Sequence, residues 1–250
     1  MVITKKLSAK TTALIVCFTA LYTVFCFIPI SPIIGLPGKT ITAATIIAPI
    51  IGMILGPFIG AFSTLLGGTV ASFASVFSPP SLVSGVVTAF CSGMLFLHKR
   101  SLCVFTYFSL LFLFGFYPFV GPVWLYPPLM WFQIVGFLIL VSPLQSKAIK
   151  NLNSKKVSKL FQAFFVTSLT STLAGQIAGS LVFEVLAWPI FMADVNGWRA
   201  TWQFLTFLYP AERVLIALMA TLIGTTLHNI LKSANLTFFF NPYVQQEKCP

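Results

Sequence analysis

Charge is scarce in this chain, and negative charge is scarcest. Only four Asp and Glu residues stand against fifteen Lys and Arg, and charged residues make up 8% of the 250 residues. A soluble protein of this size could not cover its 27 Phe, 6 Tyr and 5 Trp without exposing large apolar patches. The hydrophobic share of 58% therefore favours a membrane-embedded protein, and we interpret the net charge of +11 through membrane topology rather than nucleic-acid binding.

Sequence motifs of catalysis are also missing. The chain has no GxxxxGK(S/T) segment that would bind ATP through a P-loop, no HExxH and no GxSxG. Its five cysteines form no CxxC pair and have no metal-like spacing. We therefore expect a protein without catalysis of its own, without a cofactor and without a metal site.

The basic residues are sorted by position along the chain. Twelve of the fifteen fall in segments that one membrane threading places on a single side: Lys5, Lys6, Lys10, Lys99, Arg100, Lys147, Lys150, Lys155, Lys156, Lys159, Lys232 and Lys248. Basic residues beside membrane spans stay on the cytoplasmic side. This pattern predicts a multi-pass protein of the cell membrane with both termini in the cytoplasm.

The apolar runs between these groups predict an all-α bundle of about eight transmembrane helices in a single membrane domain, 1–250, with six as the fallback. A span needs roughly 20 residues. Prolines and glycines separate the runs, and we place the spans at 11–28, 40–56, 57–77, 81–97, 101–120, 124–141, 160–187 and 210–231. The segment 101–142 has basic residues on both flanks, so charge leaves open whether this hairpin crosses the membrane or is re-entrant.

Most of the acidic residues lie near one end of the last two spans. Three of the four acids fall between positions 184 and 212, together with two arginines, and the predicted outer loop 188–209 also holds aromatic residues. Ionisable groups at membrane depth usually face a cavity or one another. Two interpretations stay open: the charges pin a lid, or some of them bind a polar ligand from outside. The candidate ligand-binding residues are Lys39, Glu184, Trp188, Asp194, Asn196, Trp198, Arg199, Tyr209, Glu212 and Arg213.

The first predicted span carries small residues at four-residue spacing. These are Ala9, Ala13 and Cys17, with Ala20 beside them. Such a row leaves a shallow groove where another helix can approach closely. We regard these four residues as a candidate partner interface.

Several segments resemble one known family. The alanine pair Ala9 and Ala13 precedes a Pro/Gly-rich loop, and LGPFIGA at 55–61, GGTVAS at 67–72 and AFCSG at 89–93 follow. The last span, PAERVLIALMATLIG at 210–224, adds to the likeness. Over 1–97 and 160–232 the chain resembles the substrate-binding S component of energy-coupling factor (ECF) transporters, which are modular ABC importers of vitamins and trace nutrients.

The resemblance implies a function and partners. An S component captures a small-molecule ligand from outside, beneath the first outer loop and the loop before the last helix. Its alanine pair, matched here by Ala9 and Ala13, contacts a transmembrane T component, and two ATPase subunits power release. The segment 101–142 departs from the usual six helices of that family. The alternatives are a stand-alone secondary transporter or permease, and a membrane enzyme or assembly factor that acts on lipid-linked substrates.

Overall fold

The computed structural model of the chain describes residues 9–33, 38–74, 77–152, 154, 156–190 and 192–234. This part is almost entirely helical. Its elements are α1 (Ala9–Phe25), β1 (Pro29–Pro32), β2 (Thr40–Thr42), α2 (Ala44–Leu55), α3 (Pro57–Phe73), α4 (Pro79–Phe96), α5 (Arg100–Gly115), α6 (Pro122–Leu125), the 3-10 helix η1 (Pro127–Met130), α7 (Trp131–Val141), α8 (Pro143–Asn151), α9 (Val157–Ala187) and α10 (Val195–Ser233).

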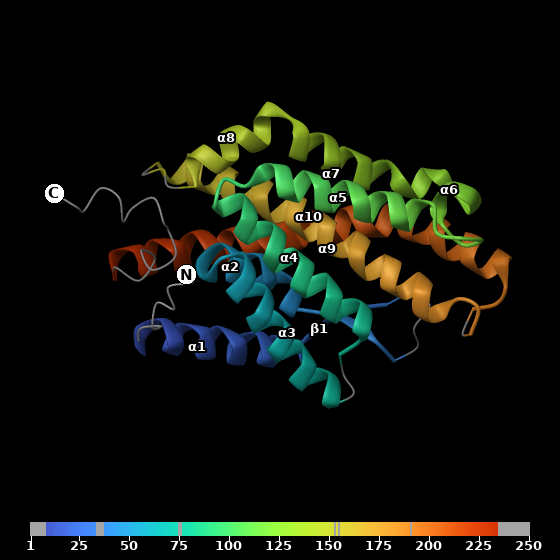
Figure 1. Cartoon of the computed structure of the whole chain (residues 1–250), viewed down its shortest axis with the longest axis horizontal. Coiled ribbons are helices and arrows are strands. Elements are labelled where there is room, and N and C mark those ends of the chain that lie inside the picture. The colour runs from blue at the N-terminus through green and yellow to red at the C-terminus, as the bar shows by residue number, and fades with distance from the viewer. Residues whose placement is uncertain are drawn as a thin grey trace, which may run out of the picture.

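The long helices lie side by side in an elongated bundle (Figure 1). Within the described residues, α4, α9 and α10 are each long and apolar enough to cross a membrane. Residues 127–141 and α8 form a pair bent by 63° that would count as a fourth crossing. The predicted all-α membrane architecture is confirmed at this level, whereas the count of eight spans stays a prediction.

Capping residues and prolines define where several helices begin. The Ser78 hydroxyl accepts a hydrogen bond from the Ser81 amide at 3.3 Å and so caps α4, whose first residues are Pro79 and Pro80. The Asp194 carboxylate accepts bonds from the Asn196 and Gly197 amides, each at 3.0 Å, and starts α10. These side chains satisfy amide groups that would otherwise lack partners at the helix ends.

The last helix differs from the prediction. We expected it to begin at Pro210, after an outer loop over 188–209, but α10 begins at Val195 and runs through Pro210. A proline inside a helix leaves the carbonyl four residues earlier without its amide partner. Here that carbonyl belongs to Thr206, and the Trp131 Nε1 group donates a hydrogen bond to it at 3.2 Å. A tryptophan from the 101–142 segment thus supplies a donor to the carbonyl that the proline leaves free.

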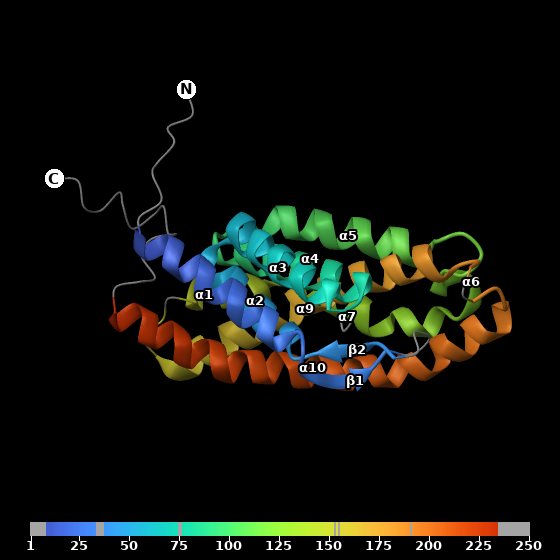
Figure 2. The ribbon, with the colours of Figure 1, turned by 90° about the horizontal axis from the view of Figure 1, so that it is seen from below.

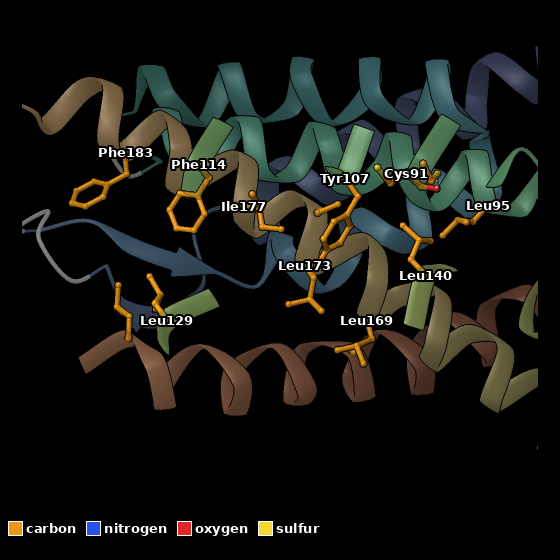
Figure 3. Close-up of a cluster of buried hydrophobic side chains, with 14 of the residues drawn as sticks. Cys91, Leu95, Tyr107, Phe114, Leu129, Leu140, Leu169, Leu173, Ile177 and Phe183 are labelled. Atoms are coloured by element: carbon orange, nitrogen blue, oxygen red, sulfur yellow. Dashed lines mark hydrogen bonds between the residues drawn. The ribbon is translucent and has the colours of Figure 1, made fainter. Parts of the chain in front are cut away.

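The 101–142 segment packs along α9 and the first half of α10. The Trp202 Nε1 group donates to the Val120 carbonyl at 2.8 Å, and the Trp202 and Phe114 rings meet edge to face with centroids 5.8 Å apart. Figure 3 shows Leu173 and Ile177 of α9 near the side chains of Tyr107 and Phe114 of α5, in one buried cluster. The segment is therefore part of the bundle core and not an appendage.

Close helix contacts form the centre of the bundle. A Cβ atom on Gly175 of α9 would lie 2.0 Å from the Thr88 hydroxyl of α4, and one on Gly52 of α2 would lie 2.0 Å from the Ala89 carbonyl oxygen. Small residues let membrane helices approach this closely and gain van der Waals contact. Helix α4 therefore packs closely against α2 at Gly52 and against α9 at Gly175.

Most of the basic residues that the structure describes lie at one end of the bundle; Lys39, Arg199 and Arg213 do not. α1 begins and α10 ends there, and α8 lies there too, while the connection from α9 to α10 lies at the opposite end (Figures 1 and 2). Lys99, Arg100 and Lys232 belong to that end, as do the lysines of α8 and of the start of α9. This arrangement agrees with the predicted sorting of charge, and the assignment of that end to the cytoplasm stays a prediction.

Candidate ligand-binding site

A cavity of about 500 Å³, measured out to its open mouth, lies beneath the β-hairpin. Its walls come from the hairpin and from α2, α4, α9 and α10. The lining residues are Ile33, Ile41, Thr45, Pro80, Ser81, Ser84, Gln176, Gly179, Ser180, Phe183, Tyr209 and Arg213. Small-molecule sites are typically concave, with apolar walls and a few placed polar groups.

The hairpin forms the roof of this cavity. β1 and β2 pair antiparallel, with Ser31 opposite Ile41, and the Ala43 amide continues the pairing by donating to the Ile28 carbonyl at 2.9 Å. A two-stranded hairpin alone is only marginally stable. A further bond holds it to the bundle, because the Ser31 hydroxyl donates to Glu212 Oε1 of α10 at 2.7 Å. Figure 2 shows the hairpin beside the middle of α10.

A buried ion pair stands where the hairpin meets α10. Arg213 Nη2 lies 3.5 Å from Glu212 Oε2, and the two side chains are 4% and 8% exposed. The pair neutralises two charges that would be costly to bury alone. Within the described residues, the Arg213 Nε group has no hydrogen-bond acceptor. Arg213 also lines the cavity.

The wall formed by α4 and α9 is polar. Ser84 projects from α4, and Gln176 and Ser180 project from α9. Gln176 is 5% exposed, and neither its amide oxygen nor its amide nitrogen has a hydrogen-bond partner within the described part of the chain. A buried amide without partners costs free energy, so this side chain is the most conspicuous polar group of the wall.

The structure brings only part of the predicted ligand set to this cavity. Tyr209 and Arg213 line it, and Glu212 stands beside it in the ion pair. Glu184 lies one helical turn beyond Ser180 and is fully buried, and within the described residues neither of its carboxyl oxygens has a partner. It is not among the lining residues.

The aromatic and polar residues near the α9–α10 connection serve the fold or the surface instead. Trp198 is completely buried against Phe183 and Trp202, and its Nε1 group donates to the Met192 carbonyl at 2.7 Å. Trp188 stacks on Phe119 with ring centroids 6.2 Å apart. The other predicted residues outside the lining are Asp194, which caps α10, Asn196 and Arg199, which are exposed, and Lys39, which is half-buried in the hairpin.

Several lining residues were not predicted from the sequence, and Gln176 is the most important of them. A signal for it was present. α9 is an apolar helix that carries Thr, Ser and Gln over 167–180, and these side chains are buried. Polar residues that recur inside a membrane helix mark its interior face.

The predicted partner residues Ala9, Ala13, Cys17 and Ala20 are all exposed on α1. They lie on a helix that packs against α2 and α3. Their short side chains leave the outward face of α1 open to a neighbouring helix. Within the described residues, no group of three or more His, Cys, Asp or Glu side chains could hold a metal ion.

In comparisons with known proteins, no family model, no curated protein and no solved structure matches the chain.

If the hydrogen bond between Ser31 and Glu212 holds the hairpin over the cavity, its loss should let the hairpin open more often. Ser31→Ala removes a hydrogen bond to a charged group, worth about 1.5–3 kcal/mol. We expect the Ile33 and Ala43 amides to exchange with solvent deuterium roughly tenfold faster, since about 1.4 kcal/mol changes an equilibrium tenfold. Ser233→Ala, at the other end of the bundle, should leave their exchange unchanged. Equal exchange in Ser31→Ala and the wild type would show that this bond does not hold the hairpin.

Proposed function

We propose that this chain is the substrate-capture subunit of an ECF-type ABC importer, which binds a vitamin or other micronutrient from outside the cell. The observation that carries the proposal is the hairpin-roofed cavity, whose wall includes Gln176 and Arg213, two residues with buried polar atoms that have no hydrogen-bond partner in the described part of the chain. In a membrane bundle, polar groups without partners cost free energy. A ligand that pairs with them and fills the apolar space would offset that cost.

The shape of the cavity suits capture. Ile33 and Ile41 cover it from the hairpin, and the Ser31–Glu212 bond joins this roof to α10. A roof on a short hairpin can open without moving the long helices, because it rests on few bonds. The pocket would then admit a ligand from the side of the membrane that the hairpin faces.

The exposed small-residue face of α1 supports the proposed partnership. Ala9 and Ala13 match the alanine pair of S components and are open to a neighbouring helix. The sequence contains no P-loop, so ATP binding would come from separate ATPase subunits joined through a T component. The remaining surface of the bundle would face the lipid bilayer.

The proposal includes a topology of eight spans with both termini in the cytoplasm and the multi-pass chain in the cell membrane. The collection of basic residues at one end of the bundle supports this orientation. In this arrangement the α9–α10 connection faces the exterior.

A labelling experiment tests the topology. Asn196 and Ser158 are both exposed near the start of a long helix, but at opposite ends of the bundle. In a background whose five native cysteines are replaced, an impermeant thiol reagent should label Asn196→Cys on intact cells and should label Ser158→Cys only after permeabilisation. The reverse pattern would overturn the orientation.

A proton-coupled permease is the second candidate, and Glu184 is the observation that favours it. Ionisable residues buried in membrane helices often belong to proton relays. Glu184 is fully buried, with both carboxyl oxygens unpaired within the described residues. Uptake by the purified chain alone, reconstituted in vesicles under a proton gradient, would favour this candidate over the importer.

The α1 face gives a direct test of the importer proposal. Ala13→Trp places a large side chain on the proposed contact, so the T component recovered with a tagged chain should fall at least tenfold. The small molecule retained by the purified chain should not change. Leu138→Trp, a substitution on the exposed face of α7, should recover the T component at the wild-type level. Normal recovery with Ala13→Trp would contradict the proposed interface.

A further inference from the structure

The unpaired atoms of the cavity restrict the chemistry of its ligand. Gln176 lies in the wall at 5% exposure, and its amide oxygen and amide nitrogen are both buried without partners in the described part of the chain. A primary amide is satisfied at both ends at once by a group that presents an N–H donor next to a carbonyl acceptor. Lactams, cyclic ureas and pyrimidinones present such an edge.

The charges beside the cavity favour a ligand without net charge at this edge. Arg213 is the one charged residue that lines the described cavity, and Glu212 pairs with it. Because the pair is formally neutral, a fully charged group placed here would gain less attraction than it would from a lone arginine. The Arg213 Nε group still offers one donor, which suits a second carbonyl oxygen.

The apolar lining fits a flat ring. Ile33 and Ile41 of the hairpin and Phe183 of α9 supply hydrophobic surface around the polar wall. Ser78 and Ser81 hydroxyls pair with each other at 2.8 Å, so Ser81 already has a partner. Among the lining residues that the structure describes, Gln176 and Arg213 are the two with buried polar atoms that lack a hydrogen-bond partner.

We infer that the ligand of this cavity is an uncharged ring with a cis-amide edge, held by the Gln176 amide, and with a second carbonyl oxygen held by Arg213. This inference rests on the proposed capture function and names the substrate class of the same site. It assigns Gln176 as the residue that determines specificity, since the Gln176 amide would form hydrogen bonds to both the N–H donor and the carbonyl acceptor of the ring.

Uracil and 1,3-dimethyluracil test the inference on the full chain purified in detergent. Both rings carry two carbonyl groups, but only uracil has N–H donors. Saturation-transfer NMR should detect uracil on the wild type and at least a tenfold weaker signal for 1,3-dimethyluracil. Gln176→Leu, which is close in size, should reduce the uracil signal at least tenfold.

Gln133→Leu is the matched control. Gln133 is also a buried glutamine, with an Oε1 atom that has no partner in the described residues, but it does not line the cavity. This variant should keep the uracil signal, and thermal unfolding of both variants reports whether they fold. Equal signals for the two rings, no uracil signal, or an unchanged signal in a folded Gln176→Leu protein would each overturn the inference.

The failure of the inference is distinguishable from that of the proposed function. If uracil does not bind and the wild type retains a small molecule without a cis-amide edge, the substrate class is wrong and capture stands. If the wild type retains no small molecule and binds no ring, the capture function fails as well.

Discussion

The fold depends on one constraint: in an apolar environment, a polar group must find its partner inside the protein. The structure meets this constraint in local ways. Hydroxyls of Thr170, Thr172 and Thr221 donate back to carbonyls of their own helices. The Trp131 side chain donates a hydrogen bond to the Thr206 carbonyl, which Pro210 leaves without an amide partner, and this bond joins the 101–142 segment to α10. Several buried side chains, such as Ser63, Gln133 and Ser168, have an atom without a partner among the described residues. Of the residues with such atoms, Gln176 and Arg213 are the ones that line the cavity, and this coincidence points to a ligand.

The sequence predicted the helical architecture because apolar runs, prolines and glycines act locally. The break at Gly56 and Pro57 and the start near Ser78 follow from backbone conformation and capping, which neighbouring residues decide. The course of α10 could not be predicted in this way. Pro210 is normally a helix breaker or first-turn residue, and the bond that Trp131, distant in sequence, donates to the Thr206 carbonyl is not visible in the local sequence.

Part of the cavity lining could be predicted from the sequence. Tyr209 and Arg213 line the cavity, and both were predicted because the scarce charged residues of this chain gather with aromatic residues before the last predicted span. Trp198 shares that composition but packs in the core, since three-dimensional neighbours decide whether an aromatic ring meets a cavity or Trp202. Gln176 carries no charge and was not predicted, although a buried glutamine in α9 is as informative as a buried arginine.

The central claim is that the cavity under the hairpin holds a small molecule, and occupancy measures it most directly. The wild type would be purified in parallel with Ile41→Trp, in which a larger side chain from the roof fills the cavity. Mass spectrometry of the molecules released on denaturation should find one compound in near-stoichiometric amount from the wild type and at least tenfold less from Ile41→Trp. The same set of released molecules from both proteins would contradict the account.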